Sequence, residues 1–218
     1  LKAAGLRRIN ISLDSLDPTV FGRLTRGGDL SRTLAGIEAA LMSGLHSVKL
    51  NMVVMRGVND GEIDAMVSYA LKARCILRFL ELMPIGLATA QFERWFVAAE
   101  TVQEIVARSY RLTPLPVIHG ATSRDFRIDD RNGRTGQVGF IAPCTTTFCA
   151  TCRRLRLTSD GFLVGCLARQ DERVNVRPFL RNAAAWEAGH GAAWVSRLLD
   201  RRSSRRFDRC AAMVAIGG

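Results

Sequence analysis

The sequence lacks the features that mark a protein for a membrane or for export. No run of eighteen apolar residues occurs, so we expect no membrane-spanning helix. No charged-then-apolar leader opens the residues given, which predicts a cytoplasmic protein. There is also no low-complexity segment and no internal repeat beyond an alternation of strands and helices. Because Leu1 is not a methionine and LKAAGL is typical of the end of a helix, we expect further chain to precede it.

Acidic residues are few relative to basic ones. The chain has 31 Lys and Arg against 20 Asp and Glu, a net charge of +11, which favours anionic partners such as nucleotides, nucleic acid or acidic surfaces. Four of the arginines, Arg201, Arg202, Arg205 and Arg206, lie close together in a late predicted helix. No aromatic residues alternate with them to stack on bases, so a solvated helix face is the favoured interpretation.

The first half alternates strand and helix patterns. Strands are expected over 7–16, 47–55 and 76–84, with helices over 29–44 and 59–74 opened by Asp29 or Ser31 and by Asn59 or Asp60. This spacing is typical of a parallel sheet or barrel. Three such units cannot close an eight-stranded barrel, so the segment is either an open α/β sheet or part of a barrel whose other strands lie upstream.

The second half has a different pattern of predicted helices and strands. A helix over 96–110 is followed by breaks at Pro114, Pro116 and Gly120, and then by short strands over 136–143, 153–158 and 162–167. The tripeptide SDG between the last two strands favours a hairpin turn. We therefore expect an α+β region with a small antiparallel sheet, followed by one or two helices and a Gly-Gly tail.

Three of the six cysteines are placed to converge. Cys149 and Cys152 form a C-x2-C pair just before a strand, and Cys166 ends the strand that returns from the turn at Asp160. A hairpin folded at this turn brings Cys166 back beside the pair, which predicts a metal site. Zinc and a [4Fe–4S] cluster both normally take four ligands, and Cys144 offers a fourth thiolate.

Two arginines follow the cysteine pair. In a strand Arg154 and Arg156 share one face, while Leu155 and Leu157 point the other way, toward a core. The planar guanidinium donates two parallel hydrogen bonds, which suits an acceptor-rich group such as a purine edge. Without the cysteines, two exposed strand arginines would be the simpler interpretation.

Several motifs together resemble one family. FCATCRRLRLTSDGFLVGCL is similar to the C-terminal cluster motif of GTP 3′,8-cyclases, F-C-x-x-C-N-R-x-R-L-T-x-D-G-x-L-x-x-C-L. AGLRRINISLDSLDPTVFGRLT, VKLNMVVMRGVNDGE, RFLELMPIG and the terminal MVAIGG resemble further family motifs in the same order. The resemblance covers the chain from end to end.

The resemblance implies a fold and an activity. The fold class is α/β: a partial, incomplete TIM-type radical S-adenosylmethionine barrel over 1–115, then an α+β C-terminal extension over 116–218 with an auxiliary [4Fe–4S] cluster and the Gly-Gly tail. The activity is that of a lyase in molybdenum-cofactor synthesis, which converts GTP to (8S)-3′,8-cyclo-7,8-dihydroguanosine 5′-triphosphate by radical chemistry. The implied partners are GTP, the next pathway enzyme cyclic pyranopterin monophosphate synthase and a second copy of the chain, with neither membrane nor nucleic acid.

The resemblance also implies roles for particular residues. Three cysteines ligate the auxiliary cluster and leave one iron for the GTP base, and the glycines of the tail reach into the active site, where side chains would not fit. The implied cluster ligands are Cys149, Cys152 and Cys166. The implied GTP contacts are Lys49, Arg78, Arg154, Leu155 and Arg156. The implied S-adenosylmethionine contacts are Ser12 and Met83, and the tail glycines are Gly217 and Gly218.

Three departures from the family pattern bear on function. The family's N-terminal C-x3-C-x2-C motif, which holds a second [4Fe–4S] cluster, is absent from this sequence, so this chain alone should be inactive. Arg153 replaces the family's Asn, and Cys144 stands where the family has no ligand. Two alternatives remain open: another radical enzyme with an auxiliary cluster, and a four-cysteine zinc module that binds nucleic acid.

Overall fold

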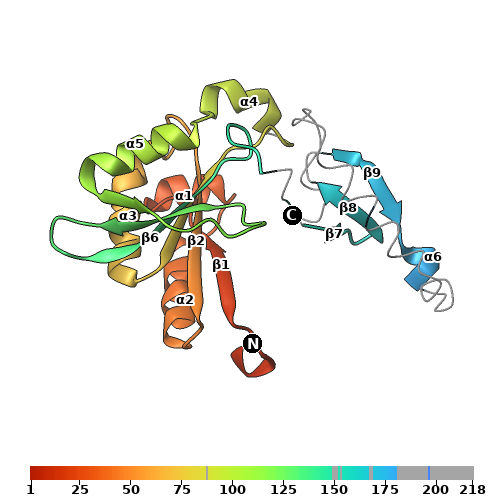
Figure 1. Ribbon diagram of the computed structural model, residues 1–218, viewed down its shortest axis with the longest axis horizontal. Helices are drawn as coiled ribbons and strands as arrows, with labels where there is room; N and C mark the ends of the chain where they lie inside the picture. The colour runs from red at the N-terminus through yellow and green to blue at the C-terminus, as the bar shows by residue number, and fades with distance from the viewer. Residues whose placement is uncertain (87, 149–151, 153, 167–168, 181–195, 197–218) are drawn as a thin grey trace. The chain divides into compact units, whose positions relative to one another are not determined.

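A computed structural model describes residues 1–86, 88–148, 152, 154–166, 169–180 and 196. The chain divides into two compact units. The first unit contains residues 1–82, 93–118 and 122–145, and the second contains 83–92, 119–121 and 146–218. Figure 1 shows the helices and strands of each unit.

The first unit is built on a six-stranded sheet with strand order β1-β2-β3-β6-β5-β4. Neighbours from β1 to β6 pair in parallel, whereas β5 pairs antiparallel with both β6 and β4. The strands are β1 (Arg8–Ser12), β2 (Ser47–Val54), β3 (Ile76–Glu81), β4 (Arg111–Pro114), β5 (Arg124–Asp129) and β6 (Thr135–Ile141).

Helices connect the parallel strands. Asp29, one of the two residues expected to open the helix over 29–44, accepts hydrogen bonds from the amides of Ser31 and Arg32. The segment expected to open a helix at Asn59 or Asp60 has no side-chain cap. The 3-10 helices are η1 (Lys2–Ala4) and η2 (Asp60–Glu62), and the α-helices are α1 (Pro18–Leu24), α2 (Leu30–Met42), α3 (Ile63–Ala73) and α5 (Ala99–Ser109). The helix α4 (Ala88–Trp95) belongs to both units, with residues 88–92 in the second.

The core of this unit lies between the helices and one face of the sheet. Residues alternate along β2 between buried and partly buried, so that every second side chain enters the core. Phe79 and Phe140 stack at 5.9 Å between ring centroids, and Phe126 meets Phe140 edge-on at 5.6 Å. The other face of the sheet is left to carry polar side chains.

The second unit contains a three-stranded antiparallel sheet in the order β7-β8-β9. The predicted SDG hairpin is confirmed: Thr158 N–H donates to Phe162 O at 2.9 Å, and Gly161 takes the left-handed φ of 77° that the turn requires. The described elements are β7 (Arg156–Leu157), β8 (Phe162–Cys166), β9 (Arg169–Asn175) and α6 (Arg177–Leu180).

The strand β6 joins a different sheet from the one that the sequence pattern predicts. The pattern groups it with the small antiparallel sheet of the C-terminal region, but it pairs in parallel with β3. The first unit therefore extends to Thr145 and crosses the division expected between 115 and 116. Pro114, expected only as a break, ends the edge strand β4, where a missing amide hydrogen costs no sheet hydrogen bond.

None of the described helices combines the length and the apolar character needed to cross a membrane.

Candidate ligand-binding face and cysteine hairpin

A row of residues crosses the open face of the first unit's sheet. The strand register places these residues side by side on successive strands. They are Ser12 on β1, Asn51 on β2, Arg78 on β3, Gly139 on β6 and Asp125 on β5. Because buried residues such as Leu50 and Phe79 alternate with them, their side chains point away from the core.

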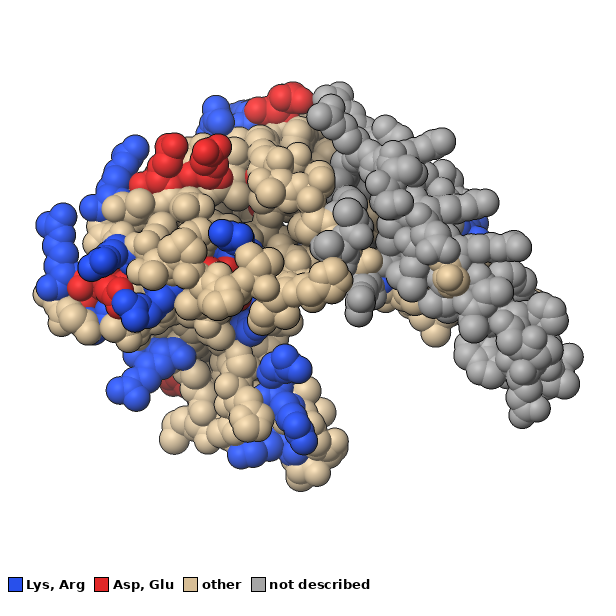
Figure 2. Space-filling view, viewed as in Figure 1, with Lys and Arg blue, Asp and Glu red and all other residues tan. Residues whose placement is uncertain are grey.

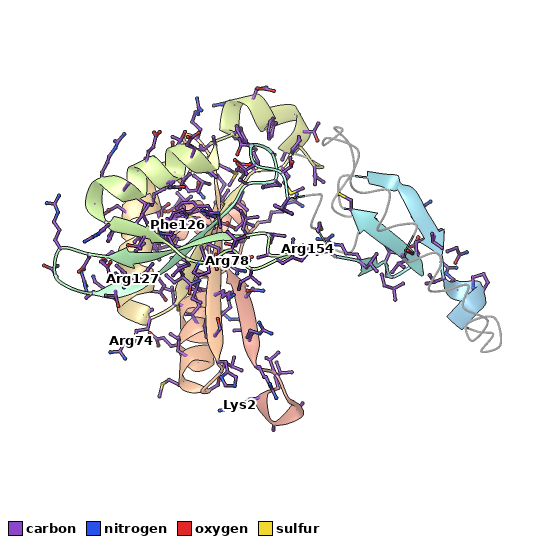
Figure 3. The ribbon with its side chains drawn as sticks, in the orientation of Figure 1. Lys2, Arg74, Arg78, Phe126, Arg127 and Arg154 are labelled. Carbon is purple, nitrogen blue, oxygen red and sulfur yellow. The ribbon has the colours of Figure 1, made fainter. Side chains whose placement is uncertain are left out.

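The absence of a side chain at Gly139 brings Arg78 and Asp125 close together. A Cβ built on Gly139 would lie 2.5 Å from Asp125 Oδ1 and 3.3 Å from Arg78 Cγ, so both side chains occupy the space above the glycine. Ser123 Oγ donates to Asp125 Oδ1 at 2.5 Å, and Gln137 Nε2 donates to Asp125 Oδ2 at 2.9 Å. These bonds fix the carboxylate, and Figure 3 shows Arg78 over the centre of this unit.

Lys49 lies on the same face, two residues before Asn51 on β2. Burial lowers the pKa of its ammonium, and the positive charges of Arg78 and Arg8 lower it further. Asp125 opposes this shift by raising the pKa. The face therefore places positive charge around the fixed Asp125 carboxylate, an arrangement that suits an anionic ligand with some hydrogen-bond donors.

Asn51 supplies an available acceptor in the middle of the row. Its Oδ1 is buried and has no hydrogen-bond partner among the described residues. A buried acceptor without a partner is costly, and a ligand that donates to it would remove this cost.

The loops that follow β1 and β2 are fixed by one buried amide. Asn59, only 1% exposed, donates through Nδ2 to Asp14 O at 2.7 Å and Val53 O at 2.9 Å, and its Oδ1 accepts from Met55 N at 2.7 Å. Asp14 Oδ1 accepts from Val53 N at 2.7 Å, although burial raises the pKa of this carboxyl. The carboxyl end of β1, where Ser12 lies, is thus rigidly attached to β2.

Glu81 fixes the segment that leads toward the cysteines. It is 3% exposed and accepts hydrogen bonds from the amides of Ala99, Cys144 and Thr145 at 2.9–3.1 Å. Cys144 Sγ donates to Leu82 O at 3.5 Å. Burial, with a further contribution from Glu81, raises the pKa of the Cys144 thiol to about 11. The Cys144 side chain is thus held by Leu82 O and its amide by Glu81, which disfavours the four-cysteine zinc site.

In the second unit, the hairpin positions two of the three predicted cluster ligands. Cys152 precedes β7, and Cys166 ends β8, which pairs antiparallel with β7. Both are half-buried, and neither is in a disulfide. The Arg154 guanidinium lies 5.8 Å from the centre of the Phe148 ring, which holds it beside the start of the cysteine segment. Cys149 lies outside the described residues.

The strand β7 is shorter than expected. Arg156 pairs with Val164 of β8 and is half-buried, as is Leu155. Leu157 is 60% exposed, so the expectation that it points into a core was wrong. An edge strand of two residues is too short to bury both of its faces.

The predicted site residues fall into three groups. Ser12, Lys49 and Arg78 share the open face of the first unit, and Arg154, Leu155 and Arg156 lie with two cysteines in the second. Met83 is half-buried in the segment that follows β3, where its carbonyl accepts from Ile85 N at 2.8 Å. Gly217 and Gly218, like Arg153 and the cluster Arg201–Arg206, are not among the described residues. Within the described part of the chain, no three His, Cys, Asp or Glu form a group able to hold a metal ion.

Asp125 and Asn51 were not predicted as site residues from the sequence. The segment RDFRID alternates polar residues with Phe126 and Ile128, which predicts a strand with Asp125 on the polar face. That signal identifies the strand but does not show which partner strand brings Asp125 to Arg78.

A parallel-rich sheet with cations and carboxylates on its open face gives the first unit a mixed α/β architecture. Residues 1–70 match the sequence model of the Radical SAM superfamily, and residues 75–207, more than half of the chain, match that of Molybdenum Cofactor Synthesis C. The chain therefore belongs to the Molybdenum Cofactor Synthesis C family.

Named relatives support this membership. The chain is 42% identical over 177 residues to a GTP 3′,8-cyclase of Petrotoga mobilis, a match that covers 81% of this chain and 54% of the relative. It is 39% identical over 191 residues to the GTP 3′,8-cyclase of Hydrogenovibrio crunogenus, covering 86% and 56% respectively. A Listeria monocytogenes GTP 3′,8-cyclase is 41% identical over 184 residues, covering 84% and 54%. The resemblance found in the motifs is confirmed, and the chain spans about half the length of the curated relatives it matches.

Proposed function

We propose that this chain is the substrate-binding part of a GTP 3′,8-cyclase that acts in molybdenum-cofactor biosynthesis. The relatives named above carry that activity in their names at 39–42% identity. Because the chain spans about half of their length, we assign the activity to the completed protein. The observation that carries the proposal is the shared placement of Ser12, Lys49 and Arg78 on the open face of the parallel sheet.

Lys49 and Arg78 would bind the sugar–phosphate side of GTP. Both are cations on one face of the sheet. The carboxylate of Asp125, on β5 of the same sheet, limits the repulsion between them. Ser12, at the carboxyl end of β1, and Met83, just after β3, would contact S-adenosylmethionine. Barrel enzymes bind ligands at the carboxyl ends of their strands, and we infer that this sheet is part of an incomplete barrel of that kind.

The hairpin of the second unit suits a [4Fe–4S] cluster with three cysteine ligands. Cys166 ends β8, Cys152 precedes the partner strand β7, and neither is in a disulfide; Cys149 would be the third ligand. A cluster held by three thiolates supplies one iron with an open position for the guanine base, while S-adenosylmethionine and a second cluster in the remaining part supply the radical. Arg154, Leu155 and Arg156 would orient the purine, so that C3′ and C8 are held close together.

The experiment that tests this proposal measures nucleotide binding to the chain after anaerobic reconstitution with iron and sulfide. Arg156→Ala should weaken GTP binding about ten- to a hundredfold, because a charge-assisted hydrogen bond contributes about 1.5–3 kcal/mol, and should change ATP binding little. Arg173→Ala is the matched control, since Arg173 lies over the Phe162 ring at 4.4 Å in the same unit and has no proposed role. Equal losses of GTP and ATP affinity in Arg156→Ala would contradict a role in reading the base.

A further inference from the structure

A cavity lies at the opposite end of the first unit's sheet from Ser12. It has a volume of about 770 Å³ and is bounded by the end of α3, the start of β3, part of β5 and the start of β6. These are the amino ends of β3 and β6, whereas the predicted S-adenosylmethionine contacts follow the carboxyl ends of β1 and β3. None of the residues assigned to GTP, S-adenosylmethionine or the cluster lines it.

The lining of this cavity is strongly basic. Lys72, Arg74, Arg127 and Arg134 contribute to it, and no Asp or Glu does. Figure 3 shows Arg74 and Arg127 on the same side of the unit, and Figure 2 shows Lys and Arg gathered near the β5–β6 hairpin, with a few acidic residues between them. The positive charge therefore converges on one bounded space.

Carboxylates outside the cavity neutralise only part of this charge. Arg127 pairs with Asp129 at 3.2 Å and Arg134 pairs with Asp130 at 2.6 Å. Within the part of the chain that the structure describes, neither Lys72 nor Arg74 makes an ion pair. Cys75 also lines the cavity, but burial raises the pKa of its thiol, so it adds no negative charge at neutral pH.

Arg74 occupies a backbone position that favours glycine. It follows the last residue of α3 in the left-handed conformation, with φ 55°, while its amide caps the helix by donating to Ala70 O and Leu71 O. Glycine is the usual residue at this position because it has no Cβ to strain the backbone. Its side chain lines the cavity.

We propose that this cavity binds a small molecule that carries two or more phosphate groups. The volume lies within the range of small-molecule sites. Guanidinium groups match phosphate oxygens with paired hydrogen bonds, and lysine adds a point charge. No aromatic side chain lines the cavity, so the phosphates rather than a stacked base carry recognition. The proposal does not rest on the proposed cyclase activity, although Gln137, which donates to Asp125 on the open face, also lines the cavity.

The test compares two glycine variants by calorimetry with inorganic tripolyphosphate at constant ionic strength. Arg74→Gly removes a cavity cation and relieves the left-handed strain. Arg26→Gly is the matched control: Arg26, with φ 58°, is the other non-glycine residue with positive φ among those described, and it does not line the cavity. We expect saturable binding to the unaltered chain, at least about tenfold weaker binding by Arg74→Gly, and unchanged binding by Arg26→Gly.

Two further measurements separate the loss of a cavity cation from a loss of folding. Thermal unfolding should show both glycine variants to be at least as stable as the unaltered chain, and Lys72→Gln should weaken binding in the same direction as Arg74→Gly. Equal losses in Arg26→Gly and Arg74→Gly, or no saturable binding of tripolyphosphate, would overturn the proposal. Tighter binding of a single-stranded RNA oligonucleotide than of tripolyphosphate, lost in Arg74→Gly, would instead assign the cavity to nucleic acid and also overturn it.

Discussion

The side chains of Arg78 of β3 and Asp125 of β5 both occupy the space above Gly139 of β6, the strand that lies between theirs. Their approach depends on the missing side chain, since a Cβ at Gly139 would lie 2.5 Å from Asp125 Oδ1 and 3.3 Å from Arg78 Cγ. A cation proposed to bind the substrate and a nearby carboxylate therefore both depend on the space that this glycine leaves.

The first prediction is that Gly139→Ala disrupts this arrangement. The new methyl group would collide with Ser123 Oγ as well as with Asp125, and we expect a loss of about 1–3 kcal/mol in the free energy of unfolding. Urea denaturation measures it. Gly36→Ala is the matched control, because its added Cβ meets nothing within 4 Å inside α2, and alanine should stabilise that helix by about 0.5–1 kcal/mol.

A result in which Gly139→Ala is as stable as the unaltered protein would contradict the close packing of Ser123, Asp125 and Arg78. Ser123→Ala combined with Gly139→Ala should recover part of the loss, because it removes the oxygen nearest to the new methyl group.

The second prediction concerns the charge of Lys49. Its pKa lies below the ordinary value of 10.5, so its positive charge, and its contribution to anion binding, is lost as the pH rises through that lowered value. Asp125 is the group that raises this pKa, so Asp125→Asn should lower it further. NMR titration of the lysine side chain measures the shift. Asp129→Asn, on the same strand and paired with Arg127, should leave the Lys49 pKa unchanged.

The lowered pKa of Lys49 also determines how the stability of the protein depends on pH. Between the lowered pKa and the unfolded value of about 10.4, the unfolded chain binds more protons at Lys49 than the folded chain does, so the stability contributed by this group rises with pH in that window. Asp125→Asn should lower the folded-state pKa further and so extend this pH range to lower pH. An unchanged Lys49 titration in this variant would show that Asp125 does not act on Lys49.

The third prediction separates cysteines that bind the cluster from one that does not. Anaerobic reconstitution of Cys166→Ala should lose the visible absorption of the cluster, whereas Cys144→Ala should keep it. The physical reason is that Cys144 is half-buried and held by two hydrogen bonds, one from its Sγ to Leu82 O and one from its amide to Glu81. Loss of the cluster in Cys144→Ala with retention in Cys166→Ala would show that the ligand set is wrong.

Local signals predicted much of this fold. The cap at Asp29 and the SDG turn depend on neighbouring residues, and both were found as expected. The helix expected over 96–110 is α5, shortened to Ala99–Ser109 because Phe96 forms a bridge with Met55 instead. Sequence patterns therefore identify the elements that depend on residues close together in the chain.

Long-range pairing was not predictable in the same way. Nothing in the segment 136–143 shows that β6 pairs with β3, more than fifty residues earlier, rather than with a C-terminal strand. The pairing decides the site, because it brings Asp125 toward Arg78 and Lys49. Glu81 was missed for the same reason: its hydrogen bonds reach Ala99 and Thr145, which are distant in sequence.

If this chain supplies the substrate-binding part of a GTP 3′,8-cyclase, adding the remaining part should produce the activity. The most direct measurement joins an N-terminal segment of the Petrotoga mobilis relative ahead of Leu1, chosen to carry the C-x3-C-x2-C motif that the family resemblance implies. Both clusters would be reconstituted without oxygen, and 3′,8-cyclo-GTP would be assayed with S-adenosylmethionine present. We predict that the joined protein forms 3′,8-cyclo-GTP and that the present chain alone neither cleaves S-adenosylmethionine nor converts GTP. A joined protein that cleaves S-adenosylmethionine but leaves GTP unchanged would contradict the proposed function.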